Sequence, residues 1–371
     1  MEDLLRSVKR VCHAGLDSVS LRRQVAARVV PRLGFDANAF STCDPDTNLM
    51  THAVAEGVPH PLAKAYAEVL YPDHCARLSM DLPRAGLAVF SMAQHSHVAR
   101  AELRAHGMSE QLHVSLMTGG RLWGTWCLMS GHEPRGRCGE RWSALRRMVP
   151  HLVRGLHAAA LVDRGLAAVG EGDAPGVLAL DVRGHPTLRT TLATRWLADL
   201  ADVGLHMPND LPLAVVALVA RLRRARTDTP DTMHVRARGV SGRWYSIRAS
   251  LAEPAASGDS AAIVVIQPAV PREVATVLTN LYDLSVRERE VIAAVTRGES
   301  TKAIADSLGL SPHTVIEHID RACRKIGVRG RKALIAKLFF DGYAPVLAKQ
   351  HAHDAPVPTP SVRMTATTRP G

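Results

Sequence analysis

The sequence predicts an α+β chain of several domains, in which two α/β modules precede an all-α module of four helices. Three observations support this prediction. Strand and helix patterns alternate over residues 1–163 and again over 177–268, a stretch rich in Gly and Ala separates them at 164–176, and residues 277–342 show helical spacing alone. A chain of 371 residues is long enough for two or three domains of roughly 100–200 residues each.

The first module combines helical patterns at its ends with strand patterns between them. Gly119-Gly120 separates two strand patterns and is a two-residue turn of the kind that closes a hairpin. Trp126 and Cys127 point to opposite faces of the second of these strands, so at most one can face a pocket, and core packing is the favoured role. The expected elements are a helix at 16–33, strands at 38–43 and 48–54, strands at 112–118 and 121–129, and a helix at 139–161.

The order of these elements resembles that of a GAF-type sensory domain. The likeness rests on Gly34-Phe35-Asp36 before the first strand, on the hairpin run from Gly119 to Gly124, and on the helix segment Val149–Leu152. The resemblance implies that residues 1–163 sense a small molecule, although some GAF domains bind none. It does not identify a ligand.

The second module, residues 177–268, is expected to contain a strand, two helices and three antiparallel strands. This order, together with Gly242-Arg243-Trp244 in the turn region, resembles a PAS-like module. The expected elements are a strand at 177–181, helices at 188–200 and 211–226, and strands at 233–238, 244–250 and 261–267.

The third module contains two short helices joined by a tight turn. Gly309 follows Leu308 and can supply the left-handed residue that ends a helix. Ser311 is a candidate N-cap with Pro312 at the first helical position, and the next helix places Val315, Ile319, Ala322 and Ile326 on one apolar stripe. This is the layout of a helix-turn-helix, whose second helix lies in the major groove of DNA.

The same segment resembles the C-terminal DNA-binding domain of the LuxR family of bacterial transcription regulators. The family's motifs recur in one register, and further helical residues at 331–339 complete the four-helix domain. The matching residues are Leu284, Ser285, Arg287, Glu288, Glu290 and Val291; Gly298, Ser300, Lys302, Ile304 and Ala305; Thr314, Val315 and His318; and Lys325, Ile326, Gly327, Val328 and Arg331.

The resemblance implies a set of DNA-contacting residues on and around the second helix. Each cation among them, taken singly, is about as consistent with an ordinary surface residue as with a DNA contact. Val315 and His318 are better explained by packing, and Ser311 by capping. The candidates are Thr301, Lys302, Ser311, Thr314, Val315, Glu317, His318, Arg321, Arg324, Lys325 and Arg331.

Two features of this helix depart from the family's pattern. Ile316 stands where the family usually has Lys, and the outward arc mixes His313, Glu317, Asp320, Arg321 and Arg324. Acidic side chains repel phosphate, although they can accept a hydrogen bond from cytosine. The target sequence and the affinity for DNA therefore cannot be carried over from the family.

Composition excludes several other classes of protein. The net charge of +11 favours polyanionic partners, but the six cysteines have no paired spacing, so no metal site and no disulfide framework are expected. The longest apolar runs are about ten residues, too short for a bilayer. No phosphate loop, GxSxG or HExxH motif occurs, so we expect no catalytic residues and no enzyme.

These observations predict a cytoplasmic, sequence-specific transcription regulator that binds double-stranded DNA as a homodimer, with RNA polymerase as a further partner and no membrane contact. No cofactor is predicted, and a small-molecule ligand of the GAF-like or PAS-like domain is left open. The alternative is a sensory or scaffold protein whose helix-turn-helix has lost DNA affinity and acts through protein contacts. The tail at 343–371 is rich in Pro and Thr and is expected to be disordered.

Overall fold

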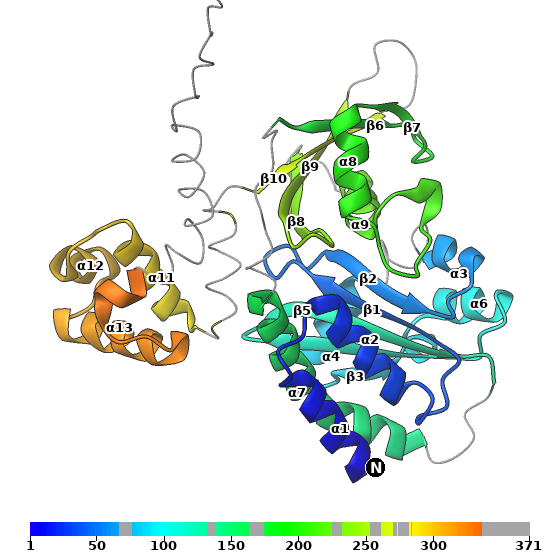
Figure 1. The fold of residues 1–371 in the computed structure, drawn as a ribbon, viewed down its shortest axis with the longest axis horizontal. Coiled ribbons are helices and arrows are strands. Elements are labelled where there is room, and N and C mark those ends of the chain that lie inside the picture. The colour runs from blue at the N-terminus through cyan, green and yellow to red at the C-terminus, as the bar shows by residue number, and fades with distance from the viewer. Residues whose placement is uncertain are drawn as a thin grey trace, which may run out of the picture.

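The structure is a computed structural model that describes residues 1–66, 76–132, 138–162, 174–224, 232–252, 261–269, 273, 282 and 284–335. Most of the expected linker at 164–176, the end of the expected last helix and the whole tail at 343–371 lie outside these residues. The described residues form two units built on β-sheets and one helical unit (Figure 1).

The first unit is a five-stranded antiparallel sheet with helices on its faces. The strand order is β2-β1-β5-β4-β3, and every strand pairing within the described sheet is antiparallel. Its elements are α1 Glu2–Cys12, α2 Ser18–Val29, β1 Ala37–Cys43, β2 Met50–Glu56, α3 His60–Ala65, α4 Ala76–Arg84, β3 Val89–Ser91, α5 Met92–His95, α6 His97–Ala105, β4 Glu110–Thr118, β5 Arg121–Ser130 and α7 Cys138–Val162.

The second unit repeats this strand order in a second antiparallel sheet, β7-β6-β10-β9-β8. Numbered from its own first strand, it has the order 2-1-5-4-3, which is also the order of the first sheet. Its elements are β6 Gly176–Leu180, β7 Pro186–Arg189, α8 Thr191–Asp199, the short 3-10 helix η3 Pro208–Asp210, α9 Leu213–Arg223, β8 Thr232–Arg238, β9 Trp244–Ala252 and β10 Ala261–Pro268.

The predicted α+β class of the chain is confirmed, since both described sheets are antiparallel and are accompanied by helices. The narrower label α/β, which was expected for each module, was wrong, and so was one element boundary. The helix expected at 188–200 begins only at Thr191, because residues 186–189 pair with β6 as an edge strand. Thr190 separates the two elements, since its hydroxyl accepts hydrogen bonds from Val177 N and Ala193 N.

Opposite faces of the first sheet carry different cores. Trp126 packs with α1, α2 and α7 on one face, while Cys127 belongs to a cluster with Leu62 and Leu103 on the other. The predicted alternation and the predicted core role of Trp126 are confirmed. Trp126 is fully buried and donates its indole N–H to Asn38 Oδ1 at 3.1 Å, so its one polar atom is satisfied.

The second unit covers the edge of the first sheet. Strand β2 lies beside α9 and β8 (Figure 1), and Val54 forms an isolated parallel bridge with Val203. The carboxylate of Asp202 accepts hydrogen bonds from Ala53 N at 2.6 Å and Leu213 N at 2.7 Å, one from each unit. The outward-facing N–H groups of Ala53 and Ala55 on the edge strand β2 thus find acceptors within the chain, at Asp202 Oδ1 and Val203 O.

An ion pair is buried in the same boundary. Arg236 on β8 donates to Asp44, which follows β1, at 2.8 Å, and their side chains are 5% and 1% exposed. Asp46 also accepts from Arg236 and from Arg121. Leu49 and Met50 of the first unit share one continuous core with Leu213 and Val235 of the second. The two units therefore pack as one body.

We expect Asp44→Asn to destabilise the boundary strongly, because it leaves a buried guanidinium with less opposite charge. Breaking a buried pair typically costs about 3–5 kcal/mol, and the remaining Asp46 should hold the loss near the lower figure. Thermal unfolding and hydrogen exchange along β2 and α9 would measure it. Asp3→Asn, which breaks the exposed pair with Arg6, is the control. Equal effects of the two substitutions would contradict the prediction.

We also expect the free energy of unfolding to depend on pH through His113. Burial lowers the pKa of His113 to about 3, below the value of about 6.5 for an unfolded chain. The stability that neutral His113 contributes is therefore complete above pH 6.5 and is lost as the pH falls toward 3. Denaturant unfolding at several pH values should give a shallower acid loss for His113→Gln than for the wild type.

Ser79→Ala is the matched control for this series, because it removes the hydroxyl 2.8 Å from His113 Nε2 and keeps the imidazole. It should lower stability by a similar amount at pH 8 and pH 5. If His113→Gln loses as much stability on acidification as the wild type does, other groups cause the acid sensitivity.

Candidate nucleic-acid interface

The helical unit is built from α11 Val286–Thr296, α12 Thr301–Leu308 and α13 Pro312–Ile326, followed by helical residues 330–335. Its core contains the predicted stripe of Val315, Ile319, Ala322 and Ile326, all of them buried. Leu334 in the final helical segment joins the same core. Four helical segments were predicted, and their positions agree with the prediction over the described residues.

Side-chain caps fix where each helix begins. Ser285 and Glu288 form a reciprocal capping box at α11, and Ser300 accepts from Ala303 N at α12. Ser311 accepts from Thr314 N at 3.0 Å, with Pro312 at the first position of α13. These bonds satisfy amide groups that have no partner within their own helix.

Left-handed glycines fix where the helices end. Gly309 closes α12 at φ 63° and Gly327 closes α13 at φ 78°. A side chain is disfavoured at such angles, so the turn between α12 and α13 requires the glycine found there. The geometry of the helix-turn-helix thus follows from a few local residues, and the sequence predicted it.

The exposed face of α13 carries a chain of ion pairs centred on an acid. Glu317 lies 3.1 Å from Arg321 and 3.5 Å from His313, each one turn away along the helix. Asp320 and Arg324 are exposed on the same helix, as is Ile316 at 48%. The mixed charge expected from the sequence is present, and Arg321 meets a carboxylate within its own helix.

Some predicted contact residues are engaged in holding the unit together. Lys325 donates to Glu288 at 2.7 Å. Burial is the largest single effect on the Glu288 carboxyl and raises its pKa, but the ion pair with Lys325 and the hydrogen bonds with Ser285 together outweigh it, so the pKa is lowered. Arg331 donates to Glu299 O and to Thr301 Oγ1 and so ties the last segment to the start of α12. Val315 has no exposed surface.

The other predicted residues lie on the surface around α12 and α13. Thr314 and Ser311 join their hydroxyls at 2.8 Å at the start of α13. His318 is half-buried, and its Nδ1 has no hydrogen-bond partner among the described residues. Lys302 and Arg324 are exposed cations on α12 and α13. The DNA-contact roles of all eleven residues remain predictions.

Two other kinds of site are absent from the parts of the chain that the structure describes. No group of three His, Cys, Asp or Glu side chains there is placed to hold a metal ion. Nor does any described helix have the length and apolar character needed to cross a bilayer.

Comparison with known proteins identifies residues 283–338 with the family model of bacterial regulatory proteins, luxR family. The spore germination protein GerE of Bacillus subtilis is 42% identical over 55 residues, which are 15% of this chain and 74% of GerE. The probable transcriptional regulatory protein NarL of Mycobacterium tuberculosis is 44% identical over 54 residues, which are 15% of this chain but only 25% of NarL.

Similar solved structures were found for longer parts of the chain, at low TM-scores. Escherichia coli SdiA matches 91% of this chain and 95% of its own, with 12% identity and a TM-score of 0.35. The GAF domain of Acinetobacter phosphoenolpyruvate-protein phosphotransferase matches 43% of this chain and 95% of its own, with 12% identity and a TM-score of 0.32. Scores this low do not decide the fold of either sheet unit.

We expect Ser311→Ala to loosen α13, because it removes the acceptor of Thr314 N. An N-cap of this kind contributes about 1 kcal/mol, whereas Gly at the same position costs only a few tenths. Amides in the first turn of α13 should exchange about fivefold faster in Ser311→Ala and nearly as in the wild type in Ser311→Gly. Equal acceleration in both variants would show that the hydroxyl matters for another reason.

Proposed function

This chain belongs to the LuxR family of bacterial regulatory proteins, and from that premise we propose that it is a sequence-specific DNA-binding transcription regulator controlled by its N-terminal units. The observation that supports the proposal most directly is the helix-turn-helix geometry of α12 and α13, with its caps and left-handed turn. Such a pair of helices presents the second one to the major groove. The family match covers this unit alone.

The sensory role of the two sheet units belongs to the proposal. Their expected GAF-like and PAS-like character agrees with the five-stranded antiparallel sheets. The proposal has four further parts. The protein acts in the cytoplasm, and two copies pair on a near-palindromic site. It contacts RNA polymerase and catalyses no reaction. Half-sites would then lie about one helical turn of DNA apart.

The charge distribution on α13 favours moderate rather than strong attraction to DNA. Glu317 accepts from Arg321, so a phosphate must compete with a carboxylate already in place. Lys302 and Arg324 are therefore the best candidates for phosphate contacts, since they are exposed and belong to the two helices of the motif.

We expect Lys302→Ala and Arg324→Ala to weaken DNA binding for all sequences and to make it less sensitive to salt. Each lost phosphate contact should reduce the slope of log affinity against log salt by about 0.9. Fluorescence anisotropy with genomic fragments selected by footprinting would measure both quantities. Arg287→Ala, which removes an exposed cation paired with Glu290 on α11, is the control. Unchanged slopes in both test variants would refute these contacts.

The alternative of a helix-turn-helix without DNA affinity predicts a different result. In that case the wild type would protect no fragment at low salt, and only the combined Ile316→Lys and Asp320→Lys variant would bind. If the wild type binds one site tightly and this variant only relaxes its specificity, the regulator proposal stands.

A further inference from the structure

An open groove of about 830 Å³ lies along α9 and is lined by residues of both sheet units. Val216, Ala220 and Arg223 of α9 line it and recur at steps of four and three, so they share one side of the helix. The turn at 182–185 between β6 and β7 lines it from the second unit, and α3 lines it from the first. The volume is within the range of about 300–1,000 Å³ that is usual for small-molecule sites.

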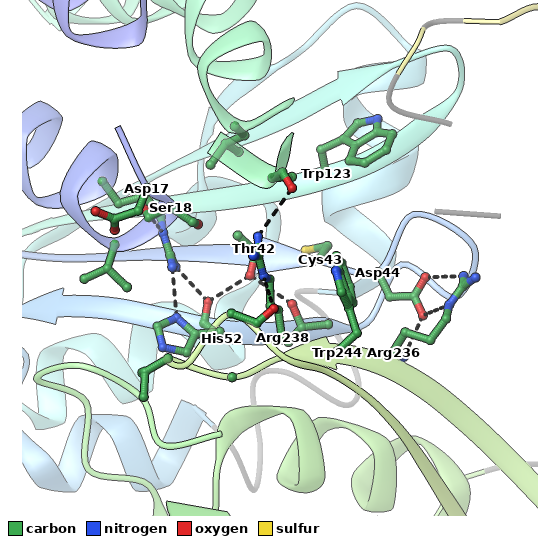
Figure 2. Close-up of a pocket in the computed structure, with 18 of the residues that line it drawn as sticks. Asp17, Ser18, Thr42, Cys43, Asp44, His52, Trp123, Arg236, Arg238 and Trp244 are labelled. Carbon is green, nitrogen blue, oxygen red and sulfur yellow. Dashed lines mark hydrogen bonds and ion pairs between the residues drawn. The ribbon is translucent and has the colours of Figure 1, made fainter. Parts of the chain in front are cut away.

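The groove differs in charge from the cavity of about 330 Å³ between the two units, which Figure 2 shows. That boundary cavity is lined by Trp123, Trp244 and Arg238 and by the paired side chains of Asp44 and Arg236. The described lining of the groove contains Lys, Arg and His side chains but no Asp or Glu. Its charges therefore favour an anion.

Two hydrogen bonds hold the turn between β6 and β7 against the rest of the second unit. Asn209 Nδ2 donates to Gly184 O at 2.9 Å, and Arg223 Nη1 donates to Val182 O at 2.7 Å. The first bond comes from the segment that precedes α9, and the second comes from the last residue of that helix. This wall of the groove therefore has a defined position in the fold.

Two exposed cations of the lining have no acidic partner among the described residues. They are Lys64 on α3 and Arg183 in the turn, and neither side chain forms a hydrogen bond or an ion pair with any residue that the structure describes. Asp181 lies next to the turn but outside the lining, and its carboxylate accepts the backbone N–H groups of Arg183 and His185 at 2.9 and 2.8 Å. Lys64 and Arg183 can therefore each pair with an anionic group of a ligand.

The apolar part of the lining is aliphatic. Val182 is 42% exposed, and Val216 and Ala220 are partly exposed, so apolar surface is open to a ligand. No phenyl, phenol or indole ring belongs to the described lining, so a flat aromatic ligand would have no such ring to stack on there. An aliphatic chain can cover this surface, and each methylene that it buries should tighten binding by up to about fourfold.

We propose that this groove binds an amphipathic anion, namely an unbranched aliphatic chain with a carboxylate or phosphate head. The chain lies on Val182, Val216 and Ala220, and the head lies toward Lys64 and Arg183. The inference rests on the proposed function, because it gives the sensory units a class of ligand. Since α3 and α9 belong to different units, one ligand in the groove can contact both of them.

Isothermal titration of the full chain with hexanoate, octanoate and decanoate tests the ligand class. Each added pair of methylenes should tighten binding about fourfold or more, because the chain leaves water. Octanol should bind about fivefold more weakly than octanoate because it has no charge, and octyl phosphate beside octanoate shows which head is preferred. An affinity that does not rise with chain length, or octanol that binds as tightly as octanoate, would overturn the ligand class.

Lys64→Met and Arg183→Met test where the head lies. Each should weaken octanoate about threefold, a modest effect because both cations are exposed to water, and should leave octanol within about twofold. Arg104→Met removes an exposed cation on α6 outside the lining and is the control. Unchanged octanoate affinity in both test variants would overturn this placement of the head.

Val182→Glu tests the groove itself, because it replaces exposed apolar surface with a negative charge and leaves the core of the unit intact. It should weaken octanoate about tenfold or more. Val240→Glu is the matched control, since Val240 is 57% exposed in another turn of the same unit and lines the boundary cavity instead. Binding that is lost in Val240→Glu and kept in Val182→Glu would place the ligand in the boundary cavity and overturn the proposal.

These titrations are made without DNA, so they separate the groove from the proposed function. If no acid binds the folded wild-type chain, the groove is rejected as a ligand site whether or not the chain binds DNA. Absent DNA binding would reject the proposed function and would leave the calorimetry unaffected.

Discussion

The boundary between the two sheet units is the constraint on which most of this structure depends. Arg236 and Asp44 are both buried there and come from different units, so neither charge is balanced unless the units are docked. Asp202 adds a second requirement, because its carboxylate accepts from backbone amides on both sides. Burial raises the pKa of Asp202 to about 7 in spite of these two donors.

This docking explains features that each unit alone would leave unexplained. Strand β2 is a sheet edge, yet all of its residues except Glu56 are buried, because the second unit covers it. The apolar residues of both units merge into a single core. The cavity lined by Trp123, Trp244 and Arg238 lies in the same boundary. A signal that changed the docking would therefore act on the core, the charges and the cavity together.

The helical unit follows different rules. Its geometry is set by local groups, namely serine caps and left-handed glycines, and by one apolar stripe on α13. The caps, glycines and apolar stripe do not fix the side chains on its exposed surface. On that surface Glu317 pairs with Arg321 and His313. The scaffold can thus match the family closely while the exposed face departs from it.

The sequence by itself determined the elements whose causes are local. Periodicity and capping located α2, α7, α13 and the hairpin of β4 and β5, and motif register identified the family of residues 283–338. The edge strand at 186–189 was missed because Leu188 continues a helical pattern although it is exposed, and only pairing with β6 makes this segment a strand. Lys325 and Arg331 were predicted to contact DNA, which stays a prediction, and the sequence did not indicate the partners 37 and 30 residues away that tertiary structure gives them. The pairing of Asp44 with Arg236 across 192 residues, and the cavity beside it, were likewise decided by tertiary structure, because burial and charge pairing between distant segments leave no periodic signal in the chain.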